Sequence, residues 1–130
     1  MIGRALAGAA VTGAVIVAGA LAAGVPGGTY SEEIAGATPP VLNGTWSVAL
    51  KPSSFTIRKG AALAVVGTLV VSKGRLQFTD TGGPFRCLGA TAKGSYGYVL
   101  KGKTLALKPV SEPCVGRKLV LTAHPLKRVG

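Results

Sequence analysis

The chain has very few of the side chains that catalysis and metal binding require. Its 130 residues include one histidine, two cysteines and four acidic residues. His124 is the single histidine, and Asp80 and Glu112 fall in separate loops, so the sequence supplies neither a Ser-His-Asp triad nor a zinc site. Cys87 and Cys114 lack the C-x-x-C spacing of a thioredoxin-like centre. We therefore expect no catalytic residue, no metal, no cofactor and no enzyme activity.

Acidic residues are also scarce relative to basic ones. Fifteen Lys and Arg residues against four Asp and Glu give a formal net charge of +11. Such an excess attracts polyanions, for example nucleic acid, anionic lipid headgroups or cell-wall phosphates. The basic residues are spread singly and no run of five occurs, so the pattern does not favour nucleic acid. An ordinary solvated surface would have the same pattern.

The longest stretch without charge lies at the N-terminus. Arg4 precedes an uncharged run from Ala5 to Val25, which is the layout of a signal peptide, with an A-x-A-like cleavage position at residues 20–22. The run also approaches the ~20 residues that span a bilayer, so an uncleaved membrane anchor is the alternative. We assign residues 1–23 to a signal peptide or anchor helix. The Ala-, Gly- and Val-rich composition suggests a bacterial protein, and we expect it to be secreted or extracytoplasmic.

Export would allow a disulfide. Cys87 and Cys114 form an isolated even pair, and in an exported protein such a pair fits one disulfide better than a metal site. A folded part of roughly 90 residues has only a marginal core, so a covalent link would stabilise it.

Helical periodicity is absent after the N-terminal run. Residues 24–42 are rich in Gly, Pro, Thr and Ala, and this composition predicts a flexible linker. Residues 43–130 consist of short segments of alternating polarity separated by turns. They predict an all-β domain, a small antiparallel up-and-down β-barrel of seven or eight strands. The last of these strands is expected at residues 117–124.

Two Lys-Gly pairs, at residues 73–74 and 101–102, predict tight hairpin turns. With a two-residue loop at 101–102, Tyr98 lies opposite Leu105, and both tyrosines share one face with both leucines of the hairpin. The hairpin at 73–74 also gathers large apolar residues on one face. The candidate ligand-binding residues of the inner wall are Trp46, Phe78, Tyr96, Tyr98, Leu105 and Leu107.

Gly44-Thr45-Trp46 on the first strand and Arg117 near the C-terminus resemble the lipocalin, or more broadly calycin, pattern. In that family a Gly-x-Trp tryptophan closes one end of the barrel under a basic side chain. The resemblance implies that Trp46 forms the barrel floor and that Arg117 packs on it through a cation-π contact. The region from Tyr96 to Arg117 is also similar to small secreted bacterial lipocalin-like domains of unassigned function. Glu112 is an alternative partner for Arg117.

Two functions fit these features. The first is a secreted, monomeric barrel that binds an apolar or amphipathic small molecule. The alternative is an interaction module, such as a secreted protease inhibitor or a protein that binds the anionic cell envelope. An interior cavity of roughly 300 Å³ or more would favour the first, and a filled barrel would favour the second.

Overall fold

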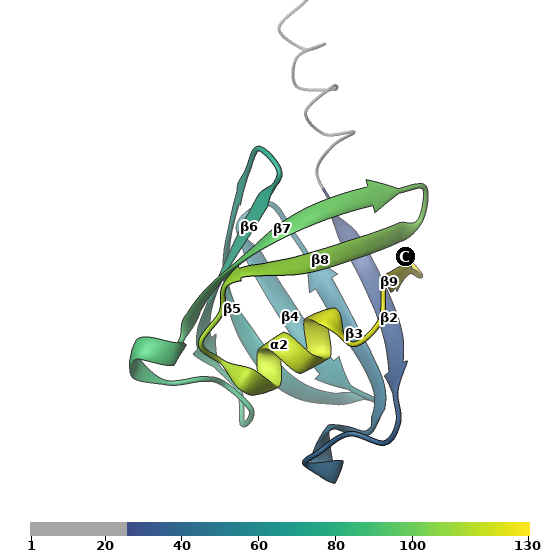
Figure 1. Ribbon diagram of the computed structural model, residues 1–130, viewed down its shortest axis with the longest axis vertical. Coiled ribbons are helices and arrows are strands. Elements are labelled where there is room, and N and C mark those ends of the chain that lie inside the picture. The colour runs from purple at the N-terminus through teal and green to yellow at the C-terminus, as the bar shows by residue number, and fades with distance from the viewer. Residues whose placement is uncertain (1–25) are drawn as a thin grey trace, which may run out of the picture.

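Residues 26–130, which the computed structural model describes, form a closed barrel of eight antiparallel strands (Figure 1). The predicted all-β, up-and-down architecture is confirmed, and it is compatible with a calycin-like fold. The expected signal peptide or anchor lies outside the described residues. Between residues 26 and 130, no helix is both long and apolar enough to cross a membrane.

The strands follow one another around the barrel in chain order. They are β2 (Gly28–Ile34), β3 (Gly44–Leu50), β4 (Ser54–Lys59), β5 (Ala62–Ser72), β6 (Arg75–Gly82), β7 (Lys93–Lys101), β8 (Thr104–Ser111) and β9 (Leu126–Arg128). The helices are the 3-10 helices η1 (Pro40–Leu42) and η2 (Gly89–Thr91) and the α-helix α2 (Val115–Thr122). Pairing of β9 with β2 closes the barrel, with Tyr30 opposite Arg128 and Ser31 opposite Lys127.

The barrel includes part of the segment for which the sequence predicts a flexible linker. Residues 28–34 form β2, which pairs with the whole of β3. Tyr30 and Ile34 are 0% and 4% exposed, so this strand contributes to the core. Glu32 lies between them and also faces inward, and a charged residue at a core position hides the period-two pattern that identifies a strand.

The predicted last strand is instead a helix. Residues 115–122 form α2, so the expectation of a strand over 117–124 and of no further helix is wrong. The buried residues of this segment are Arg117, Val120 and Leu121, and their spacing of three and four matches one face of a helix. The eighth strand is β9, which begins after Pro125. In Figure 1, α2 lies alongside β8.

Both predicted hairpins are present, but the sequence placed only one of the two loops correctly. The loop between β5 and β6 is Lys73-Gly74, as the sequence predicts. The loop between β7 and β8 is Gly102-Lys103, one residue later than predicted, and Tyr98 therefore lies opposite Leu107 rather than Leu105. The partners shift by two positions, and because side chains alternate with a period of two, every residue keeps its predicted face. Gly102 has a φ of 58°, which glycine adopts without strain.

The two ends of the barrel differ. At the hairpin end lie the turns at 51–53, 73–74 and 102–103, the start of β2 and the end of β9. At the helix end lie the loops at 35–43 and 83–92, the turn at 60–61, and α2. Figure 1 draws the hairpin end at the top and the helix end at the bottom.

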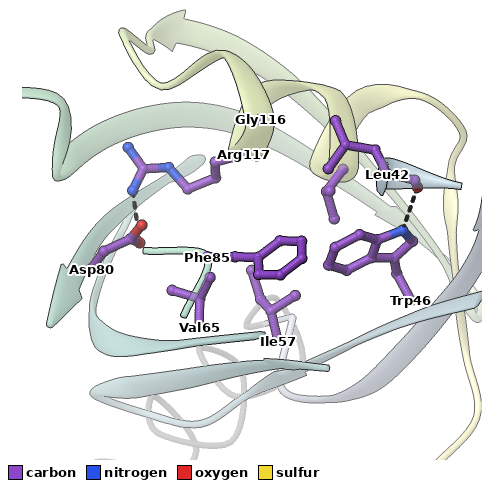
Figure 2. Close-up of a pocket in the computed structure, with 9 residues that line it drawn as sticks. Leu42, Trp46, Ile57, Val65, Asp80, Phe85, Gly116 and Arg117 are labelled. Carbon is purple, nitrogen blue, oxygen red and sulfur yellow. Dashed lines mark hydrogen bonds and ion pairs between the residues drawn. The ribbon is translucent and has the colours of Figure 1, made fainter. Parts of the chain in front are cut away.

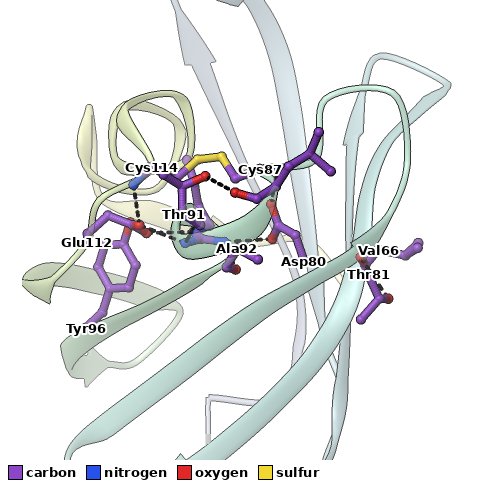
Figure 3. A network of polar contacts seen from close by, with 11 residues as sticks. Val66, Asp80, Thr81, Cys87, Thr91, Ala92, Tyr96, Glu112 and Cys114 are labelled. Atoms are coloured by element: carbon purple, nitrogen blue, oxygen red, sulfur yellow. Dashed lines mark hydrogen bonds and ion pairs between the residues drawn. A yellow bond between two sulfur atoms is a disulfide. The ribbon is translucent and has the colours of Figure 1, made fainter.

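The predicted disulfide joins two segments of the helix end. Cys87 and Cys114 are linked, with their Cα atoms 6.2 Å apart. Cys87 belongs to the loop between β6 and β7, and Cys114 is the N-cap of α2. The bond therefore fixes the beginning of the helix to a loop of the barrel (Figure 3).

Candidate functional site

Aromatic side chains fill the interior of the barrel. Phe78 packs edge to face on Phe55 and on Tyr96, with ring centroids 5.0 and 5.6 Å apart. Trp46 is 1% exposed, and Phe78, Tyr96 and Leu105 are fully buried. An eight-stranded barrel is just wide enough for its side chains to fill it. Four of the six predicted ligand-binding residues are therefore packed into the hydrophobic core.

A small cavity remains beside Trp46 at the helix end (Figure 2). Its volume is about 40 Å³. Phe85, from the loop between β6 and β7, packs edge to face on Trp46 with a centroid distance of 5.9 Å. The cavity is far smaller than the roughly 300 Å³ at which ligand pockets begin. Its lining residues are Leu42, Trp46, Ile57, Val65, Asp80, Phe85, Gly116, Arg117 and Val120.

The remaining two predicted residues, Tyr98 and Leu107, are half-buried and border a different feature. They line a surface hollow of about 460 Å³ together with Gly74, Gly97 and Lys108, among others. The hollow lies on β7 and β8 beside the turn between β5 and β6. The structure thus divides the six predicted residues between the core and this hollow and does not gather them in one pocket.

Arg117 is the centre of a buried polar network, whose carboxylates appear in Figure 3. Its guanidinium donates to Glu112 with an Nε–Oε2 distance of 2.6 Å and to Asp80 with an Nη1–Oδ1 distance of 2.8 Å. It also donates to the backbone carbonyls of Thr91 and Ala92. The Asp80 and Glu112 side chains are 1% and 0% exposed. The network confirms the pairing of Glu112 with Arg117 that the sequence offered as an alternative.

The contact between Arg117 and Trp46 that the family resemblance implies is replaced by other contacts. Two carboxylates hold the guanidinium, and Phe85 lies between it and the indole in Figure 2. The indole Nε1 donates to the carbonyl of Leu42 at 2.8 Å. Charge-assisted hydrogen bonds to carboxylates are stronger than a cation-π contact, which explains why the Arg117 guanidinium contacts Asp80 and Glu112. Gly44, the third residue of the implied pattern, has a φ of 137° beside the Lys59 side chain.

The network fixes the charge states of two of its members. Burial disfavours ionisation of Glu112, but hydrogen bonds from Arg117, Tyr96 and the Cys114 amide outweigh it and lower the pKa of Glu112. Burial, with the hydrogen bond to Glu112, raises the pKa of Tyr96. Neither group has a pKa near neutrality, where a general acid or base works best. The network is therefore suited to holding α2 in place rather than to transferring protons.

A second buried carboxyl, Glu32, did not stand out in the sequence. It is 7% exposed, and both of its carboxyl oxygens lack a hydrogen-bond partner. Burial raises its pKa to about 7, an effect that the nearby His124 backbone amide partly offsets. Glu32 borders a surface hollow of about 520 Å³ between β2 and the segment that connects α2 to β9. The one signal in the sequence was its position midway between the apolar residues Tyr30 and Ile34, on the face that both of them share.

The charged side chains on the exterior of the barrel are almost all cationic. Of the four acidic side chains in residues 26–130, Glu32, Asp80 and Glu112 are buried, and Glu33 alone is exposed within that part of the chain. Net charge alone could not reveal this, because it does not distinguish buried from exposed groups. The twelve exposed basic residues are Lys51, Arg58, Lys73, Arg75, Arg86, Lys93, Lys101, Lys103, Lys108, Lys118, Lys127 and Arg128.

Comparison of the chain with protein-family models, with curated proteins and with solved structures returned no match.

Proposed function

We propose that this barrel is a non-enzymatic interaction module that binds an anionic surface or polymer of the cell envelope. The observation that carries the proposal is the contrast between twelve exposed basic side chains and one exposed acidic side chain among residues 26–130. A field of one sign raises the local concentration of polyanions and accelerates their association. An extracytoplasmic location is part of the proposal, and the Cys87–Cys114 disulfide is consistent with it.

The filled interior favours surface recognition over internal ligand binding. The cavity beside Trp46 has a volume of about 40 Å³, which is close to the space of a single water molecule. Admission of an apolar ligand would require Phe78, Tyr96 and Leu105 to leave a close-packed core. Close-packed cores resist such rearrangement, because each displaced side chain loses its contacts and its burial.

The expected interaction is strong at low salt and weak at high salt. Each Lys or Arg near an anionic membrane surface contributes about 1 kcal/mol, so about eight of the twelve acting together give micromolar binding. Exposed charges are screened over about 10 Å at 0.1 M salt. Binding carried by these residues should therefore decrease steeply as salt is added, whereas burial of an apolar ligand should not.

The test is a titration of the full chain with inorganic polyphosphate, with an uncharged dextran and with a fluorescent fatty acid, each at 20 and 500 mM NaCl. We expect polyphosphate to bind at low salt, to be released at high salt, and dextran not to bind. Absence of polyphosphate binding at 20 mM NaCl would refute the proposal. Saturable, salt-insensitive fatty-acid binding without polyphosphate binding would favour an apolar ligand instead, and its loss in Tyr98→Ala would assign that ligand to the hollow on β7 and β8.

A further inference from the structure

We propose that the hairpin end of the barrel docks on a membrane surface rich in anionic lipid headgroups. This inference rests on the proposed function and adds to it the face that binds and the chemistry of the partner. It draws on the distribution of charge along the barrel, on the exposed apolar side chains at this end, and on the place where the chain enters the barrel.

Charge is distributed unevenly along the barrel axis. The hairpin end carries no acidic side chain, because Glu32 and Glu33 lie toward the far end of β2, Asp80 toward the far end of β6, and Glu112 beyond β8. Basic side chains flank each of its three turns. These are Lys51, Lys73, Arg75, Lys101 and Lys103, and Arg128 lies at the end of β9.

Three of these cations are grouped where the chain enters the barrel. The backbone N–H of Arg128 donates to the carbonyl of Lys103 at 2.7 Å, and Lys101 flanks the same turn. The Arg128 side chain lies directly over Gly28, with Nε 2.8 Å from where a Cβ of that residue would be. Arg128 therefore lies against the first residue of β2, and Lys101 and Lys103 belong to the turn that precedes β8, the neighbour of β9.

Exposed apolar side chains lie among these cations. Val70, Val99 and Val129 are 56%, 55% and 64% exposed, and each is within a few residues of a turn or chain end at the hairpin end. Lysine stems cover apolar surface while their ammonium groups remain in water. Valines between lysines therefore suit the boundary between headgroups and acyl chains, whereas a purely ionic polymer gains nothing from them.

The described chain enters the barrel at this same end, where β2 begins at Gly28. In Figure 1, β2 begins at the end of the barrel that carries the turns of the β5–β6 and β7–β8 hairpins. In the sequence the preceding residues include the uncharged run from Ala5 to Val25, which approaches the length that spans a bilayer. If that run is retained as an anchor, the hairpin end is the face held next to the bilayer.

The first test is lysine footprinting of the full chain by acetylation and mass spectrometry. The chain is mixed with vesicles of pure phosphatidylcholine or of phosphatidylcholine with 40% phosphatidylglycerol. We expect the anionic vesicles to slow acetylation of Lys73, Lys101 and Lys103 at least threefold and to leave Lys93 and Lys118, at the helix end, unchanged. The comparison between vesicle types controls for apolar insertion of residues 1–25, because both types have an apolar interior. Equal protection at both ends, or protection of Lys93 and Lys118 alone, would overturn the inference.

The second test compares two matched charge reversals in the full chain. K73E/K101E/K103E alters the hairpin end, and R86E/K93E/K118E alters the helix end by the same charge. Loss of one or two cations from an anionic surface weakens binding about tenfold, and each Glu adds repulsion. We therefore expect K73E/K101E/K103E to weaken binding to anionic vesicles at least about 100-fold and R86E/K93E/K118E to weaken it less than about fivefold. Equal weakening would contradict the proposed orientation.

A parallel titration with polyphosphate separates the two proposals. If the unmodified chain does not bind polyphosphate at 20 mM NaCl, the proposed function fails, and the membrane inference that rests on it fails as well. If it binds polyphosphate but not anionic vesicles, the membrane inference alone fails. The helix end also exposes apolar residues, including Phe85 and Leu88, so protection confined to Lys93 and Lys118 would assign docking to that end.

Discussion

Glu32 is a carboxyl group that the barrel buries without a hydrogen-bond partner. Burial raises its pKa from 4.5 to about 7, so between these values the native state holds a proton that the unfolded chain has lost. The stabilising effect of this proton is complete below about pH 4.5 and is lost as the pH rises to about 7. At 1.36 kcal/mol per pKa unit, Glu32 should lower the free energy of unfolding by about 3 kcal/mol across this interval.

Urea unfolding at several pH values, followed through Trp46 fluorescence, measures this effect. Glu32→Gln should remove most of the decrease between pH 4.5 and 7.5, because the amide does not ionise. Glu33→Gln is the matched control, since Glu33 is the exposed neighbour on the same strand. If the pH profiles of Glu32→Gln and the unmodified chain coincide, the carboxyl of Glu32 is solvated or paired.

Arg117 offers a second prediction for a single residue. Arg117→Met keeps most of the side-chain volume but leaves Asp80 and Glu112 buried without their cation. We expect a loss of about 3 to 5 kcal/mol in the free energy of unfolding, which is typical when one partner of a buried ion pair is removed. Lys118→Met, at the next and exposed position, should change stability little. A loss below 1 kcal/mol for Arg117→Met would indicate a solvated network.

At the scale of the element, substitution of Gly116 tests whether residues 115–122 form the helix α2. Gly116 is the second residue of the helix, and a Cβ added there would meet no atom within 4 Å. Gly116→Ala should therefore raise the free energy of unfolding by about 0.5 to 1 kcal/mol through helix propensity. Thermal unfolding is the measurement. Gly67→Ala on β5 is the contrast, because its Cβ would collide with the Thr79 carbonyl and the Phe55 ring.

The helix also shows where prediction from sequence reached its limit. Strands β3, β4 and β6 were predictable because their apolar residues alternate, as Trp46, Val48 and Leu50 do, and β5 because its apolar run ends at the Lys73-Gly74 turn. Over residues 117–124 the same apolar residues satisfy both a period of two and a helical face, and tertiary packing of Arg117 decides between them.

The Glu112–Arg117 ion pair could be predicted from the sequence because the two residues are five positions apart. Asp80 could not be predicted as a partner, since it lies 37 residues from Arg117.

At the scale of the whole molecule, the cationic exterior should affect stability as well as binding. Exposed like charges repel one another in the native state, and salt screens this repulsion. The free energy of unfolding should therefore rise, on the order of 1 kcal/mol, between 10 and 200 mM NaCl. Over the same range polyanion binding should weaken, so salt should act in opposite directions on the two properties.

Chemical denaturation by urea at each salt concentration measures this rise. The variant R86E/K93E/K118E has a lower net charge and should show a smaller salt dependence. Stability that falls with salt would mean that attraction, for example within surface ion pairs, dominates the exterior.

Strand β9 sets the order in which the barrel should come apart. It pairs with β2 and with β8 at only two positions each, whereas the other neighbouring strands pair at five or more. Local opening begins where backbone pairing is shortest, so amide protons of β9 should exchange with solvent before those of β5, β6 and β7. The Cys87–Cys114 bond holds the start of α2 through such an opening. The C-terminal segment would then detach locally while remaining tethered at Cys114. It would re-form its native pairing quickly, because the disulfide keeps it near the barrel.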